Sequence, residues 1–280
     1  MDIATIIGLI VAIAAVLIGL VLSGGSITAY MQLASAVIVF GGTLGSTFMS
    51  YPLEVSINAL SKTLVKVLKM RKVNHLETVE KIVSFATIAR KDGLLAIEKK
   101  LGDVEDRFLK KGLQLAVDGI ESNKIIEIME ADLEEMEARH AQGINWFGTA
   151  GGYAPTFGII GTVLGLIIAL GSMDSPEALG TAVAAAFLTT LYGIAAANLL
   201  FLPVAKKLKV NSEQEMREKQ LMMRGILGIQ SGANPRLIKE ELMAFAKLDA
   251  EKNNKEKKKK PDQNKKVKKD AAGKQKAKNK

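Results

Sequence analysis

The sequence predicts an all-α, polytopic membrane protein with four transmembrane helices and a helical cytoplasmic insert between the second and third. Four uncharged apolar runs divide the 280 residues, and each approaches the roughly 20 residues that a helix needs to cross a bilayer. Charged residues with helical apolar spacing fill the region between the second and third runs. No alternating strand pattern of useful length is present.

Changes in composition divide the chain into five parts. These are residues 1–52 with the first two transmembrane helices, 53–146 as a cytoplasmic helical domain, 147–205 with the third and fourth helices, 206–250 as cytoplasmic C-terminal helices, and 251–280 as a disordered lysine-rich tail. The tail holds fourteen lysines and four acids, a net charge of +10 against +9 for the whole chain. No aromatic residues are interleaved with these lysines, so we predict no nucleic-acid partner.

The first two apolar runs are predicted to be retained membrane helices. Residues 3–22 follow Asp2 in place of a basic segment and lack a small-x-small cleavage pattern, which argues against a signal peptide. The second run, 27–51, has a GxxxG pattern at Gly41 and Gly45, which predicts a close helix contact. Pro52 marks its exit.

The insert is predicted to be a set of helices separated by glycine-containing turns. Asn74 and Glu77 have the spacing of a capping box, and Asp92-Gly93 and Asp118-Gly119 are turn signals. The predicted helices cover residues 74–90, 94–101, 104–117 and 122–142, and two more follow Ala205 and Asn234.

The third and fourth runs form a hairpin around which the chain is organised. Between His140 and Lys206 the only charged side chains are Asp174 and Glu177, which lie in the short break between two apolar arms. Small residues let helix backbones approach closely where lipid offers no hydrophobic drive. The hairpin is therefore predicted to pack against other helices through glycines 158, 161, 165, 171, 180 and 193.

No ionisable Asp, Glu, Lys or His lies inside the four predicted membrane helices. Such a group is the usual functional residue of an intramembrane ion path, so ion conduction would require a carboxylate from another polypeptide. The hairpin offers hydroxyls, which we interpret as bonding backbone carbonyls one turn back. Adjacent helical residues point about 100° apart, so at most one of two neighbouring threonines faces a pore. The hydroxyls are those of Thr162, Thr189, Thr190 and Tyr192.

Pro155 and Pro203 lie at opposite ends of the hairpin sequence, and the hairpin would bring both near the cytoplasmic face. One interpretation is a first-turn proline at 155 and a helix terminator at 203. The other is a pair of hinges that expose carbonyls where helix movement couples to the insert. Trp146 and Tyr153 are interpreted as interfacial anchors.

Orientation follows from the distribution of basic residues. Basic segments follow the second and fourth helices, whereas the turns at 23–28 and 172–178 have no Lys or Arg, so both termini are predicted to be cytoplasmic. The chain has no cysteine and only two histidines, so no disulfide or metal site is expected. Without a nucleotide or hydrolase motif, we predict neither an enzyme nor a cofactor.

Three strings resemble the MotA/PomA flagellar stator family. They are Ala-Pro-Thr-Phe-Gly-Ile-Ile-Gly-Thr-Val-Leu-Gly at 154–165, Leu-Thr-Thr-Leu-Tyr-Gly at 188–193 and Leu-Pro-Val-Ala-Lys-Lys-Leu at 202–208. The resemblance extends over residues 1 to about 250. It implies a subunit of the bacterial inner membrane that forms a pentamer around a dimer of a MotB-like, single-span partner. That partner would bring the ion-binding aspartate, and ion flow would drive rotation against the rotor protein FliG.

The resemblance also implies roles for individual residues. Arg90 and Glu98 match the family's rotor-binding arginine and glutamate, although Lys99 and Lys100 stand where some relatives have further acids. Pro155 and Pro203 match the family's two functional prolines, and with Thr189 and Thr190 they are predicted to serve the ion pathway or its coupling. Without the resemblance, Arg90 and Glu98 would be assigned to an ordinary solvated face.

The transported ion is predicted to be a proton, with sodium as the alternative. Sodium-using relatives have an additional threonine near the position of Ala141, although Thr149 lies close by. Sodium needs several oxygen ligands, and the hairpin sequence has few. Two other functions stay open at this point: an ExbB/TolQ-type ion-driven energiser of outer-membrane processes, which generally has three membrane helices, and a membrane enzyme or transporter that works alone.

Overall fold

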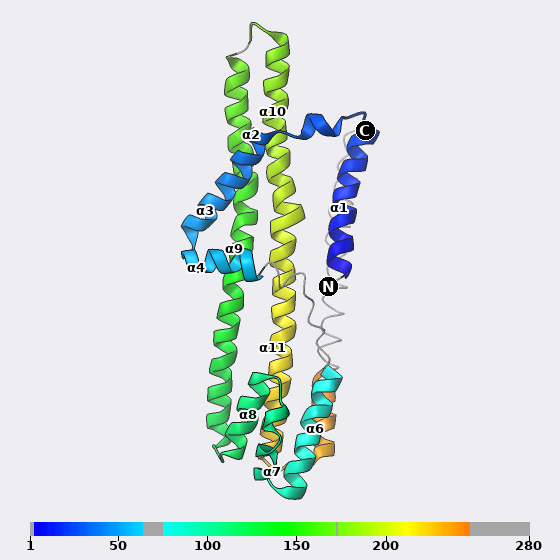
Figure 1. Ribbon diagram of the computed structural model, residues 1–280, viewed down its shortest axis with the longest axis vertical. Coiled ribbons are helices and arrows are strands. Elements are labelled where there is room, and N and C mark those ends of the chain that lie inside the picture. The colour runs from blue at the N-terminus through cyan, green and yellow to red at the C-terminus, as the bar shows by residue number, and fades with distance from the viewer. Residues whose placement is uncertain (1–2, 64–74, 172, 247–280) are drawn as a thin grey trace, which may run out of the picture. The chain divides into compact units, whose positions relative to one another are not determined.

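The computed structural model describes residues 3–63, 75–171 and 173–246, and every regular element in these ranges is a helix (Figure 1). The chain divides into two compact units. Unit 1 consists of Met1–Lys72 and Glu134–Glu215, and unit 2 of Val73–Leu133 and Met216–Lys280. The predicted capping box at Asn74 and the tail at 251–280 lie outside the described residues.

The first part of unit 1 is one long helix followed by shorter elements. In order they are α1 (Ile3–Leu22), η1 (Ile27–Tyr30), α2 (Leu33–Ala36), the π-helical η2 (Val37–Gly41), α3 (Gly42–Ser50), α4 (Leu53–Asn58) and the π-helical η3 (Ala59–Thr63). Pro52 ends α3 as predicted, because the residue before a proline is driven out of the helical region. Tyr51 accordingly has the extended angles φ −135° and ψ 153°.

The hairpin of unit 1 uses much longer helices. α9 (Ser122–Leu170) is followed by α10 (Pro176–Ala195), the π-helical η5 (Ala196–Phe201) and α11 (Leu202–Gln230). α10 begins where predicted, because the Ser175 hydroxyl accepts a bond from the Ala178 N–H, Pro176 occupies the first turn, and Glu177 suits the positive end of the helix dipole.

Three described helical runs are long and apolar enough to cross a membrane. They are Leu33–Ser50 and segments within Ser122–Leu170 and Pro176–Gln230, and α1 adds the shorter apolar segment Ile7–Leu22. These four segments correspond to the four predicted membrane helices.

α9 is longer than the sequence suggests. The prediction that the acidic helix ends near Gln142 is wrong, because α9 continues without interruption to Leu170. A glycine that stops a helix usually takes a positive φ. Gly143 is not among the described glycines with positive φ, so it continues the helix.

The core of unit 1 is built from three aromatic residues, Val39 and a set of alanines; the aromatic residues are Trp146, Phe147 and Phe201. Trp146 is fully buried, its ring lies edge-on to Phe147 with centroids 5.0 Å apart, and its Nε1 donates to the Ser56 hydroxyl at 3.1 Å. The interpretation of Trp146 as an interfacial anchor is therefore wrong. Buried alanines surround this pair at positions 59, 150, 154, 196, 197 and 205.

The glycine contact predicted for the second membrane helix involves a different glycine. A Cβ at Gly41 or Gly45 would meet nothing within 4 Å, whereas a Cβ at Gly42 would overlap the ring of Phe157. The GxxxG pattern therefore does not mark a contact within the described chain. Gly42 marks the contact instead, because it lies on the side of the helix that faces α9.

Unit 2 is a small bundle of the predicted helices with adjusted ends. Its elements are α6 (His75–Asp92), α7 (Leu95–Glu98), η4 (Leu101–Asp103), α8 (Arg107–Val117), the first part of α9, the last part of α11, and a helix over residues 235–246. Both predicted glycine turns are confirmed: Gly93 has φ +84° and Gly119 has φ +73°, angles that glycine adopts without the steric cost of a Cβ.

The core of unit 2 is made of large aliphatic side chains. Ile82, Ile97, Leu113, Ile125 and Ile226 are all completely buried. Beside this core, Asp106 caps α8 by accepting from the N–H groups of Phe108 and Leu109 at 3.0 and 3.2 Å. Unit 2 is therefore a helical bundle with an apolar interior of large side chains.

Candidate functional site

The two arms of the hairpin touch through backbone atoms. A Cβ at Gly193 of α10 would lie 2.6 Å from the Ala154 carbonyl oxygen and 3.0 Å from the Gly158 Cα on α9. A Cβ at Gly165 would lie 2.7 Å from the Ala186 Cβ. The prediction that glycines permit close packing is confirmed at these positions, whereas Gly180 has nothing within 4 Å.

Four oxygen atoms meet where α9 and α10 cross. The Thr162 hydroxyl lies 2.9 Å from the carbonyl oxygen of Gly158 and 3.0 Å from that of Ala186, and it contacts the Thr190 hydroxyl. The Thr190 hydroxyl lies 3.5 Å from the Gly158 carbonyl. The predicted bond one turn back is confirmed for Thr162, but Thr190 turns to the other helix because Thr162 lies against the carbonyl that Thr190 would use.

Thr189 faces a different neighbour. Its hydroxyl donates to the Ala185 carbonyl at 3.0 Å, as predicted, and also lies 2.7 Å from the hydroxyl of Ser35 on α2. Ser35 in turn lies 2.7 Å from the Gln32 Oε1. Ser35 and Thr189 are both buried. No local pattern marks Ser35 or Gln32 in the sequence, because Ser35 meets Thr189 across 154 positions of the chain.

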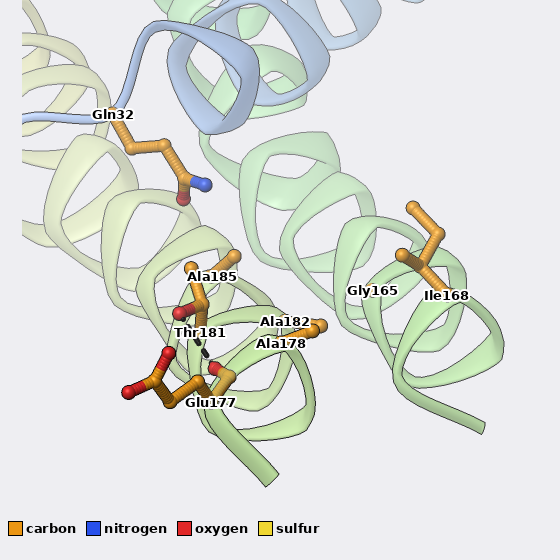
Figure 2. A pocket seen from close by; sticks show the side chains of 8 residues that line it. All are labelled: Gln32, Gly165, Ile168, Glu177, Ala178, Thr181, Ala182 and Ala185. Carbon is orange, nitrogen blue, oxygen red and sulfur yellow. Dashed lines mark hydrogen bonds between the residues drawn. The ribbon is translucent and has the colours of Figure 1, made fainter. Parts of the chain in front are cut away.

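A cavity of about 530 Å³ opens beside this polar pair. Figure 2 shows the Gln32 amide directed toward Thr181 and Ala185 of α10, with Ile168 of α9 on the opposite side and Glu177 at one end. The Thr181 hydroxyl is bonded to the Glu177 carbonyl at 2.9 Å. The cavity lining is mainly alanine, glycine and isoleucine, with Glu177 as its charged residue.

The structure corrects the first interpretation of the prolines. Pro155 lies inside α9, 33 residues after its start at Ser122, so it is not a first-turn proline. Pro203 is the second residue of α11, directly after the π-helical η5, and the helix continues to Gln230. It therefore does not terminate the helix. A proline inside a helix leaves the carbonyl four residues earlier without its N–H donor.

The two prolines mark segments that pack together within unit 1. The carbonyl left by Pro155 belongs to Gly151, and a Cβ at Gly151 would lie 2.5 Å from a Leu202 methyl group. Leu202 immediately precedes Pro203. The sequence analysis predicts that the two prolines lie near one another, and the contact between Gly151 and Leu202 agrees with that prediction.

Arg90 and Glu98 lie in unit 2, on α6 and α7, on either side of the Gly93 turn. Both side chains are exposed. No hydrogen bond or ion pair joins either one to another residue in the described part of the chain. Two unpaired, exposed charges of opposite sign are available to an external partner, but this geometry alone does not distinguish them from an ordinary solvated surface.

Known proteins provide the decisive comparison. The profile described as "Motility protein A N-terminal" matches residues 6–93, and that of the "MotA/TolQ/ExbB proton channel family" matches residues 100–221. Motility protein A of Bacillus subtilis is 40% identical over 249 residues, which cover 88% of this chain and 91% of that protein. The chain belongs to the motility protein A family.

Further relatives agree with this membership. The chemotaxis protein PomA of Vibrio alginolyticus is 38% identical, with coverage of 88% of this chain and 95% of that protein. Among solved structures, C. jejuni MotAB superimposes with a TM-score of 0.84 at 35% identity, covering 88% of this chain and 96% of that one. The flagellar MotAB stator complex from Bacillus subtilis gives 0.81 at 38% identity, covering 86% and 95%.

Membership in the motility protein A family decides between the functions that the sequence left open. The channel-family description includes TolQ and ExbB, but the N-terminal match is specific to motility protein A. The chain is therefore a flagellar stator subunit and a multi-pass helical membrane protein, and the ExbB/TolQ-type alternative is not favoured.

Proposed function

We propose that this stator subunit assembles as a pentamer with a MotB-type single-span partner and couples inward proton flow to torque on the rotor protein FliG. The observation that carries the proposal is the hairpin itself. Its helices supply hydroxyl and carbonyl oxygens at Thr162, Thr189 and Thr190 but no ionisable side chain between Trp146 and Val204 other than Asp174 and Glu177 in the turn. A partner must supply the group that binds the ion.

The proposed orientation places both termini and unit 2 in the cytoplasm of a bacterial cell, with the bilayer around α1, α2 to α3, and the apolar parts of α9 and α10. The support is the absence of Lys and Arg from the turns at 23–28 and 172–178. In this orientation the chain acts as a motor and channel subunit, not as an enzyme, and needs no cofactor.

The proposed rotor contact uses Arg90 and Glu98. Their exposure and lack of partners among the described residues support an external contact. Exposed charge pairs contribute roughly 0–1 kcal/mol each, which suits a contact that must form and release repeatedly. Charge of this kind acts mainly through steering and specificity, and less through affinity.

Proton coupling is proposed over sodium because a proton needs only a carboxylate and a water path. The oxygen cluster around Thr162 and Thr190 is the feature that could serve sodium instead, since sodium requires several oxygen ligands. Swimming speed measured while sodium is varied at fixed pH tests the choice. Independence from sodium is expected, and strong dependence would show that the ion is sodium.

Dependence on a partner is tested by reconstitution in vesicles. The chain co-purified with its MotB-type partner is expected to carry protons when the partner's ion-binding group is intact. The chain alone is expected to carry none. Coupled transport of protons or sodium by the isolated chain would overturn the proposed function.

A further inference from the structure

The segment 148–155 of α9 is intrinsically the weakest part of that helix. It contains Gly148, Gly151 and Gly152 followed by Pro155. Glycine loses more conformational entropy than other residues when it enters a helix, and Pro155 removes the donor for the Gly151 carbonyl. A helix with this sequence bends here unless surrounding contacts hold it.

On one side the segment is held by close apolar packing. Ala150 and Ala154 are fully buried, and a Cβ at Gly151 would lie 2.5 Å from the Leu202 side chain and 3.4 Å from that of Phe201. Ala150, Ala154 and Phe201 belong to the core of unit 1, whereas Leu202 is 41% exposed. These contacts fix one side of the segment, and they do not constrain the opposite side of the helix.

On the other side, two hydroxyl contacts join the segment to the end of α3. The Tyr51 hydroxyl lies 2.8 Å from that of Thr149, and the Tyr153 hydroxyl lies 3.1 Å from that of Ser50. Thr149 and Tyr153 are four residues apart, so both lie on one face of α9. Ser50 already donates to the Ser46 carbonyl at 2.8 Å, so Tyr153 is the donor to Ser50.

These contacts can open at little cost, whereas the apolar side cannot. The Tyr51–Thr149 contact is partly buried and the Ser50–Tyr153 contact is exposed, so opening them leaves no deeply buried hydroxyl without a partner. A net hydrogen bond of this kind corresponds to about 1 kcal/mol, or roughly fivefold in an equilibrium. A contact held by two such bonds can therefore open and close repeatedly.

We propose that Tyr51–Thr149 and Ser50–Tyr153 form a latch that positions the Gly151–Pro155 segment of α9, and that Tyr51 is a positioning residue for the hinge at Pro155. The inference rests on the proposed function, torque on the rotor, together with the second interpretation of the prolines, in which Pro155 is a hinge. With both hydrogen bonds of the latch formed, the segment stays straight and α9 transmits force along its axis. With the latch open, the segment bends around its apolar side.

The first test is hydrogen exchange in the full complex of the chain with its partner. Tyr51→Phe and Thr149→Val each remove one hydroxyl and keep the bulk of the side chain. Each is expected to lower the protection factors of the amides of residues 148–154 by about fivefold. Because both substitutions break the same bond, the double variant is expected to show no larger loss than either single variant.

Matched controls separate the latch from a general effect of losing a hydroxyl. Tyr30→Phe removes the hydroxyl of an exposed tyrosine in η1, outside the segment, and Thr87→Val removes a hydroxyl that bonds the Val83 carbonyl at 2.8 Å. Neither is expected to change protection at 148–154. If Tyr51→Phe folds poorly, Ser50→Ala tests the second contact of the latch alone.

The second test is the torque of single motors at high and low load. Tyr51→Phe is expected to lose torque per stator at high load, because an unlatched hinge yields under force, while unloaded speed and the number of stators recruited stay normal. A defect in folding or abundance would lower the stator number instead. Reduced torque at high load together with a normal number of stators would not be seen if Tyr51 only stabilised the fold.

The outcomes distinguish the latch from the hinge on which it rests. Normal torque in Pro155→Ala would overturn the interpretation of Pro155 as a hinge. Reduced torque in Pro155→Ala, combined with unchanged protection and unchanged torque in Tyr51→Phe, would overturn the latch alone. Additive protection losses in the double variant would show that Tyr51 and Thr149 act separately, which also contradicts the latch.

Discussion

The two units of this chain bury different kinds of polar group. The buried polar residues of unit 1 are all hydroxyls, those of Ser35, Thr43, Thr47, Ser56 and Thr189 among the described residues. In unit 2 the corresponding set includes Glu218 and Lys219. Lys219 Nζ lies 2.5 Å from the Asp106 carboxylate. One unit is stabilised by neutral hydrogen bonds between small side chains, and the other by an ion pair beside an aliphatic core.

The proposed orientation, with the apolar helices of unit 1 in the bilayer and unit 2 in the cytoplasm, accounts for this difference. In lipid, association gains nothing from removing apolar side chains from water, so small residues and hydroxyl bonds replace large apolar contacts. A buried charge there is costly without a partner. In water, burial of large apolar side chains drives folding, and a paired charge can be tolerated beside the core. The two units therefore pack by different interactions: small residues and hydroxyl hydrogen bonds in unit 1, and large apolar side chains with an ion pair in unit 2.

The largest expected effect is in unit 2. Asp106→Ala removes the counter-charge of Lys219, whose side chain is only 6% exposed, and also the cap of α8. Breaking a buried pair from one side costs about 3–5 kcal/mol. Asp106→Asn is the matched control, because asparagine is an equally good cap but carries no charge. Thermal unfolding of the purified complex, with hydrogen exchange to locate the change in unit 2, measures both.

If Asp106→Asn proves as stable as the parent, the charge contributes nothing and the cap alone matters. Unit 2 would then not be stabilised by an ion pair, and the contrast with the neutral hydrogen bonds of unit 1 would fail.

The next effect is in unit 1. Gly193→Ala places a methyl group 2.6 Å from a carbonyl oxygen and 3.0 Å from a Cα, and overpacking of this kind costs about 1–3 kcal/mol. The same substitution at Gly180, which has open space, is expected to be neutral or stabilising, since alanine has the higher helix propensity. Unfolding in detergent of the two variants gives the comparison. Equal stability would show that the hairpin does not depend on close backbone contact.

A smaller effect on stability is expected at the surface of unit 2. Exchange of the charges in Arg90→Glu with Glu98→Arg is expected to change stability by less than about 1 kcal/mol, because exposed charges contribute little. Rotation is expected to be impaired although membrane assembly is normal. Fluorescence of labelled stators at the motor and swimming speed measure the two separately. Loss of assembly would assign the pair a structural role.

The smallest effect is expected at the exposed pair of Glu77 and Lys81 on α6, 2.8 Å apart. The hydrogen bond from Lys81 lowers the pKa of Glu77 below its ordinary value of 4.5, and the same bond raises the pKa of Lys81. A lowered carboxyl pKa stabilises the fold above pH 4.5, and this contribution disappears as the pH falls through the folded-state pKa. Lys81→Met is expected to lower the melting temperature only slightly at pH 7, because both groups are exposed, and to leave it unchanged at a pH below the folded-state pKa of Glu77. A clear drop in melting temperature at pH 7 would show that solvent screens this pair less than its exposure indicates.

Parts of the site could be predicted because the responsible signal is local. Pro155, Thr189 and Thr190 stand in short strings that are recognisable in sequence, and the turns at Gly93 and Gly119 follow from the backbone freedom of one residue. Tyr51, Ser50 and Ser35 could not be predicted, because each matters only through a hydroxyl about 100 or more positions away. The burial of Trp146 was missed for the same reason.

By itself, the sequence determined that this chain is a helical membrane protein whose hairpin lacks an ionisable group inside the bilayer. Hydrophobicity and charge are properties of each residue and its near neighbours, so they can be evaluated without a fold. Only the tertiary structure decided that α9 is continuous past Gly143, that Gly42 and not Gly41 meets a neighbour, and that Pro155 lies inside a helix whose Thr149 contacts Tyr51. These depend on which helix faces which, and that is settled by contacts between distant segments.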